Sequence, residues 1–370
     1  MARLGAGVRK RDDGTLEKRF TINGKRYSVY GKTSKEIVQK EQELRKKIEL
    51  GIYTPNRNIT LDGYFKEWIE AKRNSIKGST LKTHISYYNK HISIKLGKRK
   101  IQQIERREII NFQSELVKTL SVSTVNSIIK TLKMILYDAI NDEIIVKNPA
   151  ENIKAVKETG KKATETYHRA LTEEEQRAFM QEIKNDYYYE FIAMLLCSGM
   201  RSGEAAALTW NDVDYEKNVI HITKTVTFTE KGVLIVGDSP KSDAGKRDIP
   251  INDTIKSVLQ RQLAKMGNIV PMRNNNIFVS VYGGLIYSHA INRAISDALK
   301  RLEKKGIHID HFTAHALRDT FATRYIEQGG QPQTLKNILG HNSLAMTMDL
   351  YAHVLPNTKQ KEMENLKISI

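Results

Sequence analysis

A stretch near the carboxyl end, from His311 to His353, carries side chains suited to phosphate chemistry. It contains His315, Arg318, His341 and Tyr351. A guanidinium offers forked donors that match two phosphate oxygens, and an imidazole exchanges protons near neutral pH. A phenol can attack phosphorus and form a covalent ester. Together these residue types favour the cleavage of a phosphodiester, although each of them alone is more often structural.

Three short helices would bring these groups together. Hydrophobic periodicity and glycine breaks predict helices over residues 314–328, 333–339 and 343–354. The spacing of His315 and Arg318 places both on one face of the first helix. Gly340 ends the second helix and leaves His341 on the turn that follows. Tyr325, on the first helix, is a rival nucleophile, but we expect it to pack inside the fold.

Two further cations lie upstream of this stretch. Arg201 follows an apolar helix predicted over residues 187–197 and precedes a helix predicted to start at Ala205. The open N–H groups of a helix start favour an anion there. Strands are predicted over residues 219–223, 233–236 and 247–251, with Lys241 and Lys246 in the turn between the last two. A lysine in such a turn can protonate a leaving oxygen, or it can be a solvated loop residue.

The net charge of +18 indicates a polyanionic partner. Residues 1–57 hold 15 Lys and Arg against 7 Asp and Glu, and residues 58–157 hold 18 against 10. The remaining 213 residues hold only 27 against 25. The basic excess therefore lies in the first 157 residues, as expected of segments that grip a DNA backbone.

The chain of 370 residues is long enough for two or three domains. Its longest apolar run, from Phe191 to Cys197, is too short to cross a bilayer, and we expect a cytoplasmic protein. The single cysteine, Cys197, lies in that run and is expected to be a buried structural thiol.

Residues 1–57 are predicted to form a small DNA-binding domain. Turn signals separate strands over residues 7–11, 16–22 and 25–30, and Thr33 or Ser34 caps a helix that runs to Leu50. A helix on one face of such a sheet leaves the other face for a DNA groove or, alternatively, for a protein partner. The basic residues on these strands are Arg9, Arg11, Lys18, Arg19, Lys25 and Arg26.

Residues 58–157 are predicted to form a second DNA-binding domain, a bundle of four or five helices. Its aromatic residues, among them Tyr64, Phe65 and Trp68, are expected in the core. Clustered basic residues are expected to follow phosphates along a duplex: Lys72, Arg73, Lys77, Lys82, Lys98, Arg99 and Lys100. Polar residues 154–167 are predicted to be a linker.

The order of these residues resembles the tyrosine recombinase (phage integrase) family over residues 165–354. The matching segments are SGMRSGEAAALTW, a PKSDAGKRDIPI hairpin, HALRDTFAT, LGHNS and MDLYAH. Residues 58–157 resemble the family's core-binding domain. Residues 1–50 resemble the arm-binding domain of the integrases of conjugative transposons. The implied fold is multidomain and mainly α: a three-stranded sheet with a helix, a helical bundle, and a mixed α+β catalytic domain over residues 165–370 with a C-terminal tail.

The resemblance implies a role for each residue. Tyr351 would attack the scissile phosphate to form a 3′-phosphotyrosine and free a 5′-hydroxyl. Arg201 and Arg318 would neutralise the transition state. Lys241, favoured over Lys246, would protonate the 5′-oxygen. The supporting residues would be His315 in proton transfer at the tyrosine, His341 as a donor to a non-bridging oxygen, and Glu204 as a partner that orients Arg201 or the neighbouring loop.

The resemblance also implies partners. The covalent ester retains the bond energy, so no cofactor or metal is expected. The spacing of His311 and His315 could indicate a metal site together with His308 and Asp310. This site is disfavoured because His311 precedes its helix and no cysteine or carboxylate cluster accompanies it. The expected partners are double-stranded DNA at core-type and arm-type sites and an excisionase-type accessory protein. The chain is expected to act as a homo-tetramer on DNA, in a bacterial cytoplasm. Residues 357–370 are expected to dock on a neighbouring protomer or to fold back onto their own domain. The alternatives are a type IB topoisomerase-like enzyme and a catalytically silent DNA-binding regulator.

Overall fold

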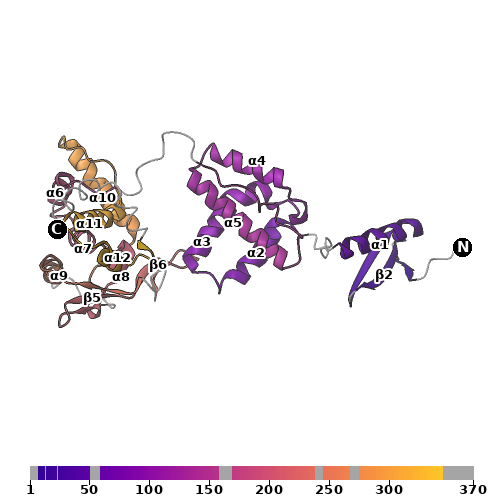
Figure 1. Ribbon diagram of the computed structural model, residues 1–370, viewed down its shortest axis with the longest axis horizontal. Helices are drawn as coiled ribbons and strands as arrows, with labels where there is room; N and C mark the ends of the chain where they lie inside the picture. The colour runs from indigo at the N-terminus through magenta and orange to yellow at the C-terminus, as the bar shows by residue number, and fades with distance from the viewer. Residues whose placement is uncertain are drawn as a thin grey trace, which may run out of the picture. The chain divides into compact units, whose positions relative to one another are not determined.

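The structure, a computed structural model, describes residues 7–12, 14–22, 24–50, 59–157, 169–237, 245–266 and 275–344. The chain divides into two compact units, Met1–Glu158 and Thr159–Ile370, and each is described by itself (Figure 1). Within the described residues no helix is long and apolar enough to span a bilayer.

The first unit begins with a three-stranded antiparallel sheet in the order β1-β2-β3. Its strands are β1 (Val8–Lys10), β2 (Leu16–Ile22) and β3 (Lys25–Gly31). Helix α1 (Ser34–Glu49) covers one face, and Leu16, Val29 and Ile37 are buried between them. The side chain of Thr33 accepts a hydrogen bond from the backbone N–H of Glu36, which caps the helix as predicted.

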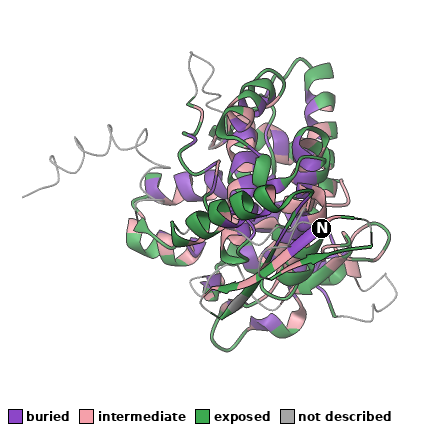
Figure 2. Ribbon diagram, turned by 90° about the vertical axis from the view of Figure 1, so that its right-hand side faces the viewer, coloured by how far each residue is buried: buried purple, intermediate pink, exposed green. Residues whose placement is uncertain are grey.

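A helical bundle follows in the same unit. It contains α2 (Leu61–Lys72), α3 (Gly78–Tyr87), a π-helix, η1 (Tyr88–Gly97), a short 3₁₀ turn, η2 (Ile101–Gln103), α4 (Arg106–Val117) and α5 (Val122–Asn141). Tyr64, Phe65 and Trp68 are buried, which confirms their assignment to the core. Figure 2 shows buried and exposed residues side by side along the helices, as expected of amphipathic helices that surround a core.

The second unit is mixed α+β, as predicted. Its helices are α6 (Glu173–Glu182), α7 (Tyr189–Ser198), α8 (Ser202–Ala207), α9 (Asp253–Met266), α10 (Ser288–Lys304), α11 (Ala314–Glu327) and α12 (Pro332–Leu339), with a 3₁₀ turn, η4 (Trp210–Asp212). Its strands are β4 (Val213–Asp214), β5 (Val219–Ile222), β6 (Thr225–Phe228), β7 (Leu234–Gly237) and β8 (Arg247–Pro250). Helix α7 lies at the centre, packed against α9 and α11.

Two expectations for this unit are wrong. The segment with Lys241 was expected in a hairpin, but β7 pairs with β6, and β8 pairs with β5 in a separate sheet of order β4-β5-β8. Burial decides the pairing, because Ile220 of β5 and Ile249 of β8 face each other in the core. Helix α8 starts at Ser202, three residues before the predicted position.

Candidate active site

Arg201 stands at the start of α8, where the sequence predicted an anion site. Its backbone N–H donates to Glu204 Oε2 at 2.9 Å, and its Nη1 donates to Glu204 Oε1 at 2.8 Å. Glu204 is 2% exposed, whereas the side chain of Arg201 is 42% exposed. The carboxylate therefore holds one side of this guanidinium and leaves the other side open to a ligand. Of the two roles expected for Glu204, to orient Arg201 or the neighbouring loop, the contact corresponds to the first.

Arg318 projects from α11 and is almost fully buried. Its Nη1 donates to the carbonyl of Gly199 and its Nη2 to the carbonyl of Leu339, both at 2.7 Å. Gly199 ends α7 with a φ of 65°, and a Cβ there would lie 2.4 Å from Phe321 Cδ1. Only glycine therefore fits the turn that presents this carbonyl to Arg318.

His341 follows Gly340, which ends α12 with a φ of 66° as predicted. Burial lowers the pKa of His341 to about 4, and the positive charges of Arg318 and Arg201 act in the same direction. The ring is therefore neutral at pH 7 and can donate one hydrogen bond without adding charge. His315 is exposed on α11 and is among the groups that lower this pKa, so it lies close to His341.

The low pKa of His341 should make the free energy of unfolding depend on pH. In the unfolded chain a histidine has a pKa near about 6.5. The unfolded state therefore binds more protons than the folded state as the pH falls from about 6.5 to 4, and stability is lost over that window. We expect a loss of up to about 3 kcal/mol at pH 4 in urea unfolding, which His341→Asn should not show. Equal losses in both proteins would contradict the buried neutral ring.

Arg247, at the start of β8, was missed by the sequence analysis. Its Nη2 donates to Glu204 Oε2 at 2.8 Å and its Nη1 to Glu204 Oε1 at 3.2 Å. Its Nε donates to the carbonyl of Ile338, and its side chain is only 6% exposed. Strand alternation could have found it, because Arg247 shares a face with the core residue Ile249.

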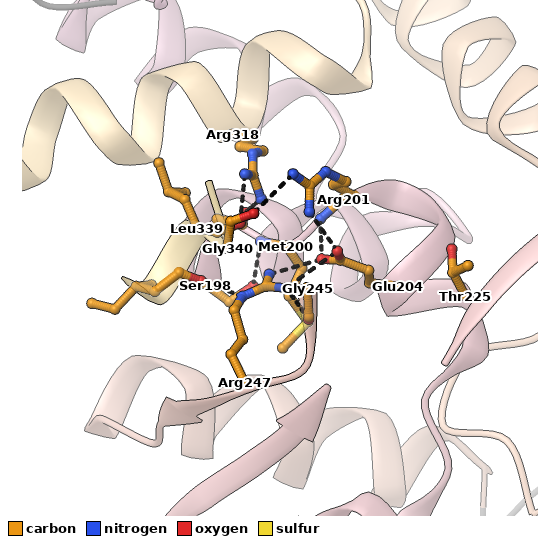
Figure 3. Close-up of polar contacts among 12 residues, drawn as sticks. Ser198, Met200, Arg201, Glu204, Thr225, Gly245, Arg247, Arg318, Leu339 and Gly340 are labelled. Carbon is orange, nitrogen blue, oxygen red and sulfur yellow. Dashed lines mark hydrogen bonds and ion pairs between the residues drawn. The ribbon is translucent and has the colours of Figure 1, made fainter. Parts of the chain in front are cut away.

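Glu204 serves two guanidinium groups at once. Burial favours its neutral form, but the hydrogen bonds and charges of Arg247 and Arg201 outweigh burial, so the pKa of Glu204 lies below its ordinary value. Figure 3 shows Arg201, Arg247 and Arg318 gathered with Glu204 beside the end of α12. These three guanidinium groups and the carboxylate of Glu204 together carry a net charge of +2, and the carboxylate of Asp319 on α11 also acts on Arg318.

Several predicted site residues are not placed in this cluster. Lys241 and Tyr351 lie outside the described residues, so their roles stay predictions. Lys246 is exposed just before β8. Tyr325 packs with Phe321 in a small apolar cluster, as expected of a structural tyrosine.

The sole cysteine also behaves as a structural residue. Burial raises the pKa of the Cys197 thiol to about 12, which keeps it protonated and unreactive at neutral pH.

The open face of the N-terminal sheet carries arginines around one buried carboxylate. Arg19 Nε donates to Glu17 Oε1 at 2.8 Å, and Arg11 Nε lies 3.4 Å from Glu17 Oε2. The guanidinium of Arg11 also lies 5.0 Å from the centre of the Tyr30 ring. Register places Arg9 opposite Glu17, and Arg26 opposite Thr21 next to Arg19. The predicted DNA-binding arginines thus share one face.

Two of the predicted DNA contacts form ion pairs away from the expected surfaces. Lys18 alternates to the face that α1 covers, where its ammonium lies 2.6 Å from Glu41. Lys72 lies 2.9 Å from Asp138 and lines a cavity of about 490 Å³ whose other charged residues are acidic. Both ammonium groups are therefore directed to carboxylates of the protein itself. Of Lys25 the structure gives only its position, opposite Ile22 at the start of β3.

The other residues of the bundle that were predicted to contact DNA are exposed, which a phosphate contact requires. Two of them also have partners within the bundle, since Arg73 lies 2.5 Å from Glu70 and Arg99 lies 3.1 Å from Glu108. The exposed set comprises Arg73, Lys77, Lys82, Lys98, Arg99 and Lys100.

Comparison with known proteins agrees with this geometry. The chain is 28% identical over 340 residues to the ICEBs1 integrase of Bacillus subtilis, a match that covers 90% of this chain and 89% of the relative. It is 29% identical over 348 residues to the transposase of transposon Tn916 from Enterococcus faecalis, which covers 89% of this chain and 82% of the relative.

Solved structures share the fold. The Tn1549 transposon integrase, in complex with a circular intermediate DNA, superposes with a TM-score of 0.70 at 25% identity, over 84% of this chain and all of that chain. A lambda integrase dimer bound to a COC′ core site gives a TM-score of 0.60 at 18% identity, over 95% of each chain. A family model described as an integrase N-terminal SAM-like domain matches residues 60–117. The phage integrase model itself matches residues 169–358, more than half of the 370, so the chain belongs to the phage integrase family of tyrosine recombinases.

Proposed function

We propose that this integrase integrates and excises a mobile DNA element through a 3′-phosphotyrosine bond formed at Tyr351. The observation that carries the assignment of the site is the cluster of Arg201, Arg318 and neutral His341, fixed by Glu204. The pentavalent transition state of a phosphodiester carries about two negative charges, which the guanidinium groups of Arg201 and Arg318 can offset.

The first chemical step follows from the roles proposed for these residues. The phenol oxygen of Tyr351 forms a bond to phosphorus as the bond from phosphorus to the 5′-oxygen breaks. His315 takes the phenol proton, and Lys241 gives a proton to the departing 5′-oxygen, which leaves as a hydroxyl. Arg201 and Arg318 neutralise the non-bridging oxygens. A 5′-hydroxyl from the partner duplex then reverses the step, so the bond energy is retained.

Three domains would divide the DNA contacts. Residues 1–57 would bind arm-type sites, residues 58–157 core sites, and residues 165–370 the scissile phosphate. On the open face of the N-terminal sheet, Glu17 holds Arg11 and Arg19 in place, so that fewer side-chain rotamers are lost when DNA binds. In the bundle, phosphates would be contacted by the exposed cations Arg73, Lys77, Lys82, Lys98, Arg99 and Lys100.

Assembly and location complete the proposal. Exchange between two duplexes, each cut on two strands, calls for four protomers on DNA, and an excisionase-type protein would set the direction. Residues 357–370 would link neighbouring protomers. The reaction would take place in a bacterial cytoplasm, where the DNA of the element is accessible.

Trapping the covalent intermediate tests this function. The full chain is incubated with randomly nicked genomic DNA from the encoding cell, because a nick next to the cut lets the short 5′-hydroxyl fragment diffuse away. Detergent-resistant adducts are then sequenced from the attached strand. Adducts at one short sequence, linked through the 3′-phosphate, would support the proposal. Adducts scattered over all sequences would instead indicate a topoisomerase, and DNA binding without adducts would indicate a silent regulator.

A further inference from the structure

Three arginines donate to three consecutive carbonyls at the end of α12. Arg247 donates to Ile338, Arg318 donates to Leu339 at 2.7 Å, and Arg201 reaches Gly340 at 3.4 Å. The last carbonyls of a helix lack partners within the helix and carry the negative end of its dipole. The end of α12 therefore gathers the guanidinium groups before any phosphate is present (Figure 3).

The three guanidinium groups differ in how many N–H donors remain available to a ligand. In Arg247 every nitrogen has a protein acceptor: Nε has Ile338, Nη1 has Glu204 and Gly245, and Nη2 has Glu204. Arg201 has one short side-chain contact, to Glu204, and one long contact to Gly340. The larger exposure of Arg201 leaves donors for a phosphate, whereas Arg247 uses four of its five N–H donors within the protein and its side chain is only 6% exposed.

We propose that Arg247 is a positioning residue for recombination, which holds Arg201 and His341 at the scissile phosphate through Glu204 and the end of α12. This inference rests on the proposed role of Arg201 as a phosphate ligand. Glu204 Oε1 accepts from both arginines, at 2.8 Å from Arg201 and 3.2 Å from Arg247. Without Arg247, the buried carboxylate would have only Arg201 as a charged partner and would draw it away from the substrate.

The end of α12 gives Arg247 a second route to the site. The carbonyl of Ile338 stands three residues before His341, whose own N–H donates to the carbonyl of Lys336 at 3.1 Å. Loss of the Arg247 contact frees the last turn of α12, and with it the carbonyls that Arg318 and Arg201 use. A displacement of about 1 Å at a reacting centre can cost about 100-fold in rate.

The test uses the full chain and a nicked duplex that carries the site identified by adduct sequencing. We expect Arg247→Met to lower the rate of adduct formation about 100-fold and to leave DNA affinity within about threefold. Arg247→Lys should recover about a tenth of the wild-type rate, since an ammonium can pair with Glu204 but cannot also reach Ile338. A wild-type protein without adducts would refute the proposed function itself. Adducts in the wild type with an unchanged rate in Arg247→Met would refute only the role of Arg247.

A methylphosphonate substrate separates positioning from general damage. It replaces one charged non-bridging oxygen by a methyl group, so it needs less neutralisation by Arg201. If Arg247 acts through Arg201, the deficits of Arg247→Met and Arg201→Ala relative to wild type should both shrink at least about tenfold on this substrate. An equal deficit of Arg247→Met on both substrates would overturn the proposal.

Two further variants control for folding. Arg261 makes a similar forked pair with buried Glu190 in the same unit, at 2.8 and 3.1 Å, and Arg261→Met should leave the adduct rate unchanged. The double variant Glu204→Gln with Arg247→Met leaves no unpaired carboxylate buried. Relative to Glu204→Gln, adding Arg247→Met should cost less than Arg247→Met costs in the wild type, because the route through Glu204 is already lost and only the contact with Ile338 remains. Losses that multiply would contradict the shared mechanism.

Discussion

Replacing Tyr351 by phenylalanine is expected to abolish covalent attachment to DNA while DNA affinity stays within about twofold of wild type. Phenylalanine keeps the ring but lacks the oxygen that would bond to phosphorus. We expect the adduct rate to fall by at least about 10⁴-fold. The measurement is a gel assay of detergent-resistant complexes on a nicked duplex, with a mobility-shift titration in parallel.

The matched control is Tyr325→Phe. Tyr325 lies on α11, packed with Phe321, and loses only its hydroxyl in this variant, so adducts should form at the wild-type rate. The reverse pattern, with adducts in Tyr351→Phe and none in Tyr325→Phe, would move the nucleophile into α11. Adducts in both single variants would exclude a tyrosine at either position as the sole nucleophile.

Local signals in the sequence predicted much of the fold because the deciding interactions are local. Thr33 caps α1 because its side-chain oxygen accepts from an N–H three residues later, and Thr172 and Glu175 form a capping box of the same local kind at the start of α6. Gly340 ends α12 because its positive φ suits a residue without a Cβ. Two tight turns likewise predict where the three N-terminal strands begin and end.

Features that depend on distant parts of the chain were harder to predict. The partners of β7 and β8 depend on which strand buries its apolar face against the core, and sequence spacing alone favoured the wrong hairpin. Lys18 was assigned to the DNA face by charge, although strand alternation and Glu41 direct it to the helix. Charge identifies a basic segment, but only packing shows which face each side chain occupies.

In the active site, too, features set by local sequence were predicted and features set by distant contacts were not. Spacing placed Arg318 on α11 and His341 after Gly340, and both lie where they were expected. Arg247 was overlooked because an arginine at a strand start is usually solvated. Its role depends on a contact with Glu204, which lies 43 residues earlier in the chain but 2.8 Å away in the fold. A residue that acts only by positioning another residue belongs to no recognisable sequence motif. Such a residue is identified from its contacts in the folded structure.

Arg318→Lys is expected to lower the adduct rate about 1000-fold at pH 7 and to recover part of it at lower pH. Burial, and then the charge of Arg201, lower the pKa of Arg318 to about 9, so the guanidinium stays protonated at neutral pH. Lysine starts from a lower pKa than arginine, and a similar fall would bring it close to neutrality. At pH 7 and above the ammonium would then lose its proton. As the pH falls, the site would regain a cation, although one without forked donors for Gly199 and Leu339.

The comparison with Arg201→Lys isolates burial as the cause. Arg201 is half-exposed and Arg318 is 2% exposed, so a lysine at position 201 keeps its charge through solvent while a lysine at position 318 does not. Adduct rates measured from pH 6 to pH 9 should therefore rise toward acid for Arg318→Lys relative to Arg201→Lys, with thermal unfolding as a check on folding. Parallel profiles for the two variants would show that geometry, rather than the loss of a buried charge, limits the reaction. In that case the forked contacts to the two carbonyls would be the essential property of Arg318.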